Sequence, residues 1–138
     1  MKLFRSTANT RLFDFIVFYG RINMMIRKSD EMRREVRSEM RGGTGDINLV
    51  HMLEKEDMKG KARLCALMQI PVSGSIGEHL HDPDAEIYLV MSGTAKLEAN
   101  GESFILNKGD AVFTGPAESH SVSNAGDTTL EIIGIVIE

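Results

Sequence analysis

The chain has 138 residues, which is enough for one domain with a single hydrophobic core. Apolar residues make up 42% and charged residues 26%, proportions that are ordinary for a globular protein and that exclude global disorder. The single cysteine, Cys65, cannot form an internal disulfide. Nothing therefore calls for an oxidising compartment, and we expect a cytoplasmic protein.

Charge is divided unevenly along the chain. Residues 1–63 hold 14 basic and 9 acidic residues, a balance of +5, whereas residues 64–138 hold 2 and 11, a balance of −9. An acidic domain repels phosphate backbones. We therefore expect no nucleic-acid partner.

Residues 1–23 differ from the rest in their aromatic content, since four of the six phenylalanines lie among the first eighteen residues. The apolar run at 12–19 is shorter than the ~20 residues that cross a bilayer, and Asp14 interrupts it, so we expect no membrane association. No small-residue cleavage site follows it. Three interpretations remain: a segment packed on the main domain, an arm exchanged in a dimer, or non-native sequence upstream of a start at Met24. We favour the third.

The first predicted element is a short N-terminal helix over about 29–40. Ser29 can cap it, and acidic residues follow in its first turn. Glutamates and arginines alternate at helical spacing, which is typical of a solvated, ion-paired helix. Three apolar residues four apart give it one apolar face: Met32, Val36 and Met40. Glycines at 42–45 should end it, so we expect an extension over 1–43 and a barrel over 44–138.

After Asp46 the pattern changes to short apolar or alternating stretches separated by turn residues. The pair Asn100-Gly101 is the strongest hairpin signal, because both residues tolerate the positive φ of a type I′ turn. About eight strands with frequent turns predict an all-β sandwich, jelly roll or small barrel. The expected strands are 47–53, 62–72, 86–91, 94–99, 103–106, 111–113, 120–123 and 129–137.

All four histidines fall in this β-rich segment; His51 is assigned no role, and the other three can form one site. His79 and His81 are two residues apart, so on a strand both imidazoles point to one face. Glu86 has the wrong parity for an unbroken strand, but Pro83 lies in a turn that can return Glu86 to the same face. His120, from a distant strand, would close the site. Three imidazoles and a carboxylate suit Mn, Fe, Ni, Co or Zn.

The segment around these residues resembles the first motif of the cupin superfamily, G-x5-H-x-H-x3-4-E-x6-G. The match holds from His79 through Glu86 to Gly93, whereas the opening glycine slot holds Ser73. The second cupin motif, G-x5-P-x-G-x2-H-x3-N, is matched less completely. Its first glycine, histidine and asparagine are Gly109, His120 and Asn124, whereas its proline and inner glycine slots hold Gly115 and Ala117.

The resemblance covers roughly 46–138 and implies a double-stranded β-helix barrel with a metal inside, frequently as a homodimer. The apolar outer side of the Glu86 strand also favours a homodimer. The chain looks most like small single-domain cupins of the oxalate-decarboxylase-like group. That likeness implies a divalent metal, with manganese as the first candidate, and a small carboxylate or keto acid as ligand. An iron-dependent dioxygenase and a non-catalytic ligand-binding or metal-sensing module are the alternatives.

Decarboxylation would need a cation for a second carboxylate and a proton donor near the metal. Arg63 and Arg41 are the candidate cations, although an arginine on an early strand, as Arg63 is, is more often a surface residue. Tyr88 is the candidate donor, because it lies two residues after Glu86 on the same strand face. A buried core aromatic explains Tyr88 equally well. Gln69 could reach inward as a supporting amide.

Overall fold

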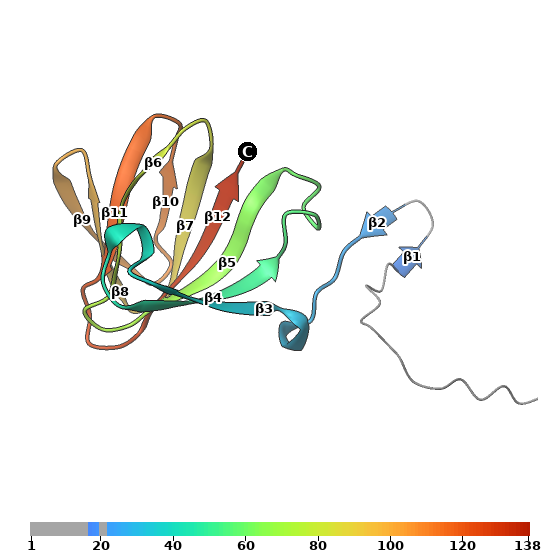
Figure 1. The fold of residues 1–138 in the computed structure, drawn as a ribbon, viewed down its shortest axis with the longest axis horizontal. Helices are drawn as coiled ribbons and strands as arrows, with labels where there is room; N and C mark the ends of the chain where they lie inside the picture. The colour runs from blue at the N-terminus through green and yellow to red at the C-terminus, as the bar shows by residue number, and fades with distance from the viewer. Residues whose placement is uncertain (1–16, 20–21) are drawn as a thin grey trace, which may run out of the picture.

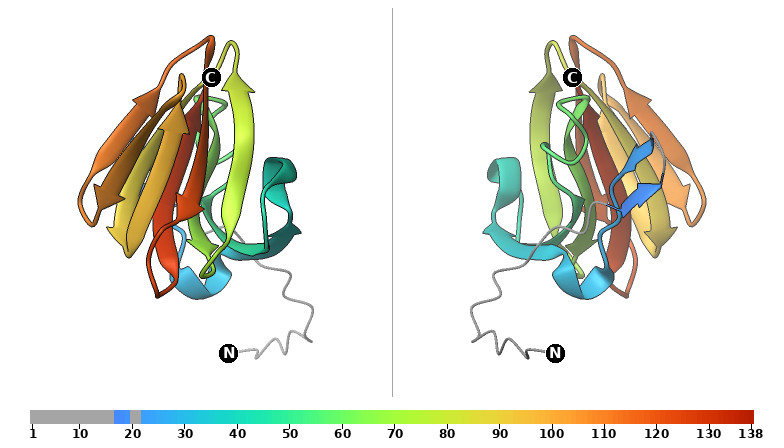
Figure 2. Two further views of the ribbon diagram at one scale, coloured as in Figure 1. Left: turned by 90° about the vertical axis from the view of Figure 1, so that its left-hand side faces the viewer. Right: turned by 90° about the vertical axis from the view of Figure 1, so that its right-hand side faces the viewer.

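The computed structural model describes residues 17–19 and 22–138. Two antiparallel sheets make up the barrel, and Figures 1 and 2 show them layered against each other. The six-stranded sheet has the order β10-β7-β12-β5-β4-β3, and the four-stranded sheet has the order β6-β11-β8-β9. The predicted all-β fold is confirmed.

Alternating burial along each strand explains the layering, because one side chain in two faces the partner sheet. Side chains from both sheets pack into a single core, among them Leu49, Met68 and Ile132 from the larger sheet and Ile76 and Val122 from the smaller. The larger sheet is built from β3 (Arg33–Ser38), β4 (Asp46–Leu53), β5 (Ala62–Ile70), β7 (Ala85–Ser92), β10 (Ala111–Thr114) and β12 (Leu130–Ile137). The smaller sheet is built from β6 (Ser75–His81), β8 (Thr94–Ala99), β9 (Glu102–Asn107) and β11 (Glu118–Asn124).

The predicted helix over 29–40 is wrong. Residues 29–31 form only a 3-10 turn, η1 (Ser29–Glu31), and the chain then continues as strand β3, which pairs antiparallel with β4. The charges that suggested helical ion pairs alternate along β3: Glu35 accepts hydrogen bonds from both Arg33 and Arg37. Pairing with β4 supplies backbone hydrogen bonds to the whole segment and overrides its helical propensity. The sheet thus begins before residue 44.

A second 3-10 turn, η2 (Met40–Gly42), connects β3 to β4. Figure 1 shows it folded over the end of β6. Two backbone hydrogen bonds join Thr44 and Ser75 there, with N–O distances of 3.2 and 2.9 Å. The carbonyl oxygen of Arg41 lies so close to Gly77 that a Cβ at Gly77 would be 2.1 Å from it. Only a glycine at 77 allows η2 to dock on β6 in this way.

Two further strands, β1 (Val17–Tyr19) and β2 (Ile22–Met24), pair antiparallel as a small hairpin outside the barrel (Figure 1). The interpretation of residues 1–23 as upstream sequence lies mostly outside the described residues. Among the residues that the structure describes, no helix is long and apolar enough to cross a membrane.

Candidate metal centre

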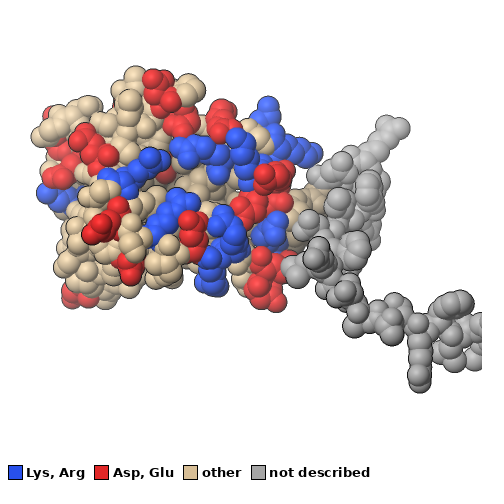
Figure 3. Space-filling view, viewed as in Figure 1, with Lys and Arg blue, Asp and Glu red and all other residues tan. Residues whose placement is uncertain are grey.

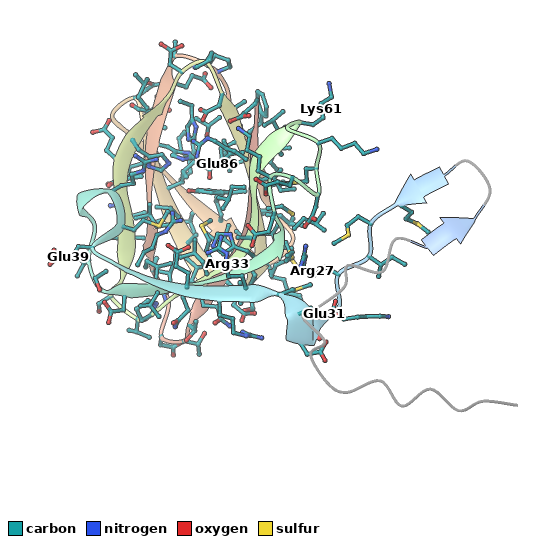
Figure 4. The ribbon with its side chains drawn as sticks, turned by 45° about the vertical axis from the view of Figure 1, so that its right-hand side comes forward. Arg27, Glu31, Arg33, Glu39, Lys61 and Glu86 are labelled. Carbon is teal, nitrogen blue, oxygen red and sulfur yellow. The ribbon has the colours of Figure 1, made fainter. Side chains whose placement is uncertain are left out.

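The two sheets bring the four predicted ligands together inside the barrel. His79 and His81 lie on β6, His120 lies on β11 directly opposite His79 in the antiparallel register, and Glu86 comes from β7 in the facing sheet. Figure 4 shows Glu86 between the sheets. The turn at Pro83 does restore Glu86 to the inner face, as the sequence predicted, since Glu86 is 3% exposed.

The ligand atoms converge on one point, within 4.8 Å of one another. Nε2 of His120 lies 3.1 Å from Nε2 of His79, 3.4 Å from Nε2 of His81 and 3.0 Å from Oε2 of Glu86. The same Glu86 oxygen is 3.1 Å from Nε2 of His81 and 3.4 Å from Nε2 of His79. A first-row ion about 2.0–2.2 Å from each ligand separates neighbouring ligands by roughly 3 Å. The set therefore fits a divalent transition metal.

The other ring nitrogen of each histidine is held by a neighbouring acceptor. Nδ1 of His79 donates to the carbonyl oxygen of Gly77, and Nδ1 of His81 donates to Oδ1 of Asp84, both at 2.9 Å. Nδ1 of His120 lies 2.7 Å from the hydroxyl of Thr114. When the ring proton of each histidine is on Nδ1, Nε2 presents a lone pair to the centre, which is the form that binds a metal.

Glu86 contributes the negative charge of the cluster. Burial acts to raise the pKa of Glu86, but hydrogen bonds with His120 and His79 outweigh it and lower this pKa to about 2. Glu86 is thus a carboxylate at neutral pH. A carboxylate and three lone pairs packed within 4.8 Å form a cation site of the mixed N/O kind.

Tyr88 lies beside the cluster, as its position two residues after Glu86 predicted. Its ring is buried and stacks on His120, with ring centroids 4.9 Å apart and an interplanar angle of 17°. Burial and the negative charge of Glu86 raise the pKa of Tyr88 well above its ordinary value. The phenol therefore keeps its proton at neutral pH.

Arg63 reaches the centre only through another residue. Its Nε donates to Oδ2 of Asp84 at 2.9 Å, and Asp84 in turn holds His81. Burial acts to raise the pKa of Asp84, but hydrogen bonds with Arg63 and His81 outweigh it, so this pKa is lowered. Gln69 does not face the site, because its amide donates to Glu131 on β12.

A cavity of about 280 Å³ extends from the cluster to the inner side of β3. In Figure 4, Arg33 lies on the side of β3 that faces Glu86, and it lines the cavity at its open end. Figure 3 shows Lys and Arg side chains gathered in a band across the visible face, with acidic side chains between them. The cations lining the cavity are Arg33, Arg37, Arg41, Lys55 and Arg63, and its carboxylates are Glu54, Glu56 and Glu86. The cavity is thus cationic although the chain carries −4 overall.

Several residues of this site were not predicted from the sequence. His51, which had no predicted role, is buried at the cavity wall with Nε2 2.9 Å from Oε2 of Glu35. Arg33 and Arg37 were predicted to lie on a solvated helix. The only indication of a role for Asp84 in the sequence is its position three residues after His81 in the turn. Nothing in the sequence indicates a role for Thr114.

The architecture and the site define a cupin, and comparison with known proteins agrees. The cupin domain family matches residues 66–137, and the chain belongs to this family. An oxalate-binding protein from Thermotoga maritima is 41% identical over 113 residues, which cover 82% of this chain and 93% of that protein.

Solved structures give the same result. The crystal structure of a predicted oxalate decarboxylase from Thermotoga maritima has a TM-score of 0.78 at 41% identity and covers 82% of this chain and 98% of its own. A cupin-like protein from the same organism has a TM-score of 0.62 at 25% identity, with 69% and 71% covered.

Proposed function

We propose that this cupin binds a divalent metal ion through His79, His81, Glu86 and His120 and uses it to hold a small carboxylate. The observation that carries the proposal is the convergence of these four ligand atoms at the inner end of a cationic cavity. The similarity to an oxalate-binding protein supports a carboxylate as the ligand. Manganese is the metal we favour, because the resemblance to oxalate-decarboxylase-like cupins implies it and the carboxylate of Glu86 suits it.

The reaction that fits these residues is decarboxylation of a small carboxylate or keto acid. A bound divalent ion would supply a Lewis acid that holds a carboxylate and stabilises developing negative charge. Tyr88 holds a proton beside the cluster and can deliver it to the carbon from which carbon dioxide departs. Leu64, Met40 and Val136 line the cavity with apolar surface that limits water near the reacting carbon. Arg63 acts here as a positioning residue, through Asp84.

Metal analysis and calorimetry test the proposal together. The purified protein should contain about one manganese or other first-row ion per chain, and oxalate should bind the manganese-loaded protein and not the metal-free protein. His81→Ala should lose most of its metal while the barrel still folds, because His81 is not one of the side chains that form the hydrophobic core. Full metal content in His81→Ala, judged against the wild type by elemental analysis, would reject the assignment.

Turnover distinguishes decarboxylation from binding alone. Release of carbon dioxide from oxalate or a 2-oxo acid, lost in Tyr88→Phe with metal content retained, supports the enzyme. Tight oxalate binding without release of carbon dioxide supports a ligand-binding module. Oxygen uptake by the iron-loaded protein would instead support a dioxygenase.

We also propose a cytoplasmic homodimer. Cys65 is the lone cysteine, so the fold requires no disulfide. The outer face of the larger sheet has an apolar row across its central strands: Val50, Leu67, Ile133 and Leu89 lie side by side in register. Phe113, on the edge strand β10 of the same face, is 64% exposed. A second copy packed on this face would cover it.

A further inference from the structure

We propose that Arg41 is the specificity-determining residue of the cavity and that its guanidinium binds the far carboxylate of a dicarboxylate longer than oxalate. The near carboxylate occupies the metal centre, so this inference rests on the proposed function. It names the ligand class, a dicarboxylate whose two carboxylates are separated by at least one carbon atom.

Arg41 differs from the other cations of the cavity in its ion pairs. Arg33 and Arg37 both bind Glu35, Lys55 binds Glu138, and Arg63 binds Asp84. Within the part of the chain that the structure describes, Arg41 makes no ion pair. An anion entering the cavity can pair with Arg41 without breaking an existing salt bridge.

The backbone holds Arg41 at the cavity wall in an unusual conformation. Its φ is +57°, in the left-handed region that a side chain such as arginine rarely adopts. The carbonyl oxygen of Arg41 packs against Gly77, and the carbonyl oxygen of Gly77 accepts the hydrogen bond from Nδ1 of His79. Gly77 thus contacts both the η2 turn and His79. These two contacts fix the backbone of Arg41 relative to the metal end of the cavity.

Charge and size both favour a second carboxylate. Arg41 lines the same cavity as His79, His81 and Glu86, so its positive charge can attract a second carboxylate there. The cavity of about 280 Å³ is larger than a ligand as small as oxalate needs. A longer dicarboxylate can use the remaining space and reach from the centre to Arg41.

Isothermal titration of the manganese-loaded full-length protein tests this with oxalate, succinate, acetate and butyrate. Succinate should bind at least tenfold more tightly than butyrate, which lacks its second carboxylate. Arg41→Gln should abolish that preference and leave acetate binding unchanged, whereas Arg41→Lys should keep most of it. The matched control is Arg34→Gln, because Arg34 lies on β3 with its side chain on the outer face, across from Val50.

The outcomes separate this inference from the proposed function. If Arg41→Gln is folded by circular dichroism and binds succinate as the wild type does, Arg41 is not the determinant. If acetate and oxalate bind but succinate gains nothing over butyrate, the longer ligand class is rejected and the metal-carboxylate function stands. If the metal-loaded protein binds none of the four, both proposals fail.

Discussion

Asp84 joins a candidate metal ligand to a cation at the cavity wall: its Oδ1 accepts a hydrogen bond from Nδ1 of His81 at 2.9 Å, while its Oδ2 binds Arg63. This carboxylate orients the imidazole, as carboxylates behind metal-binding histidines commonly do.

Asp84→Asn should therefore weaken metal binding roughly 10- to 100-fold without unfolding the barrel. Competition with a chromophoric chelator would measure the affinity. Asp82→Asn is the matched control, because Asp82 is an exposed acid in the same turn and should leave the affinity unchanged. Equal affinities of Asp84→Asn and the wild type would show that the carboxylate does not support His81.

Ala117 occupies a backbone conformation that suits glycine. Its φ is +65°, and its N–H donates to the carbonyl oxygen of His81 at 2.7 Å. The second cupin motif has glycine at this slot, and Ser73, at the opening glycine slot of the first motif, has a φ of +64°. Both turns thus adopt the left-handed conformation with a residue other than glycine.

Ala117→Gly should stabilise the protein by about 0.5–1 kcal/mol, because relief of left-handed strain, ~1–2 kcal/mol, exceeds the added entropy of the unfolded chain. Urea denaturation would measure the difference in unfolding free energy. Ala125→Gly, at a position whose φ is not positive, should destabilise or be neutral. A loss of stability in Ala117→Gly would show that the backbone at Ala117 is not strained.

Glu35 makes stability depend on pH in the acidic range. Hydrogen bonds with Arg37 and His51 outweigh burial and lower the pKa of Glu35 from 4.5 to about 2. A lowered pKa stabilises the folded state above pH 4.5, and this contribution is lost as the pH falls from 4.5 toward 2.

Glu35→Gln should therefore cost about 1 kcal/mol at pH 7, since Glu35 is partly exposed and its ion pairs are screened. The difference between variant and wild type should shrink as the solution is acidified below pH 4.5. Thermal unfolding of both proteins across pH 2.5–7 would measure this difference in stability. A difference that stays constant over this range would mean that the charge of Glu35 contributes nothing.

The proposed homodimer predicts a mass of two chains by light scattering at micromolar concentration. Ile133→Glu should give monomers, because it places a charge in the middle of the apolar row on the larger sheet. Val72→Glu is the control, since Val72 is 51% exposed in the turn after β5. A monomeric wild type would reject the dimer.

The barrel and the ligand cluster could be predicted because both are encoded locally. Alternating side chains gave the strands, and the spacing of His79, His81 and Glu86 around a proline-containing turn gave one inward-facing set. The position of Tyr88 followed from the same alternation. These inferences needed no knowledge of which strands pair.

Residues whose environment depends on strand pairing could not be predicted in the same way. The capping residue and the charge spacing of residues 33–38 fit a helix, but their charged side chains also alternate as in a strand. Only pairing with the open edge of β4 decides between helix and strand. His51 and Thr114 gain their roles from neighbours on other strands. Arg63 faces the site, but its partner Asp84 could be identified only once β5 and the turn after β6 were placed together.

The side chains that line the cavity come from two separate stretches of the chain. The four candidate ligands lie within residues 66–137, the part that the cupin family matches, whereas Arg33, Arg37 and Arg41 come from β3 and η2, ahead of it. Substitutions in this leading strand and turn can alter which anion is accepted while the metal cluster stays intact. Relatives with the same histidines and glutamate but a different leading strand should therefore share a metal and differ in ligand.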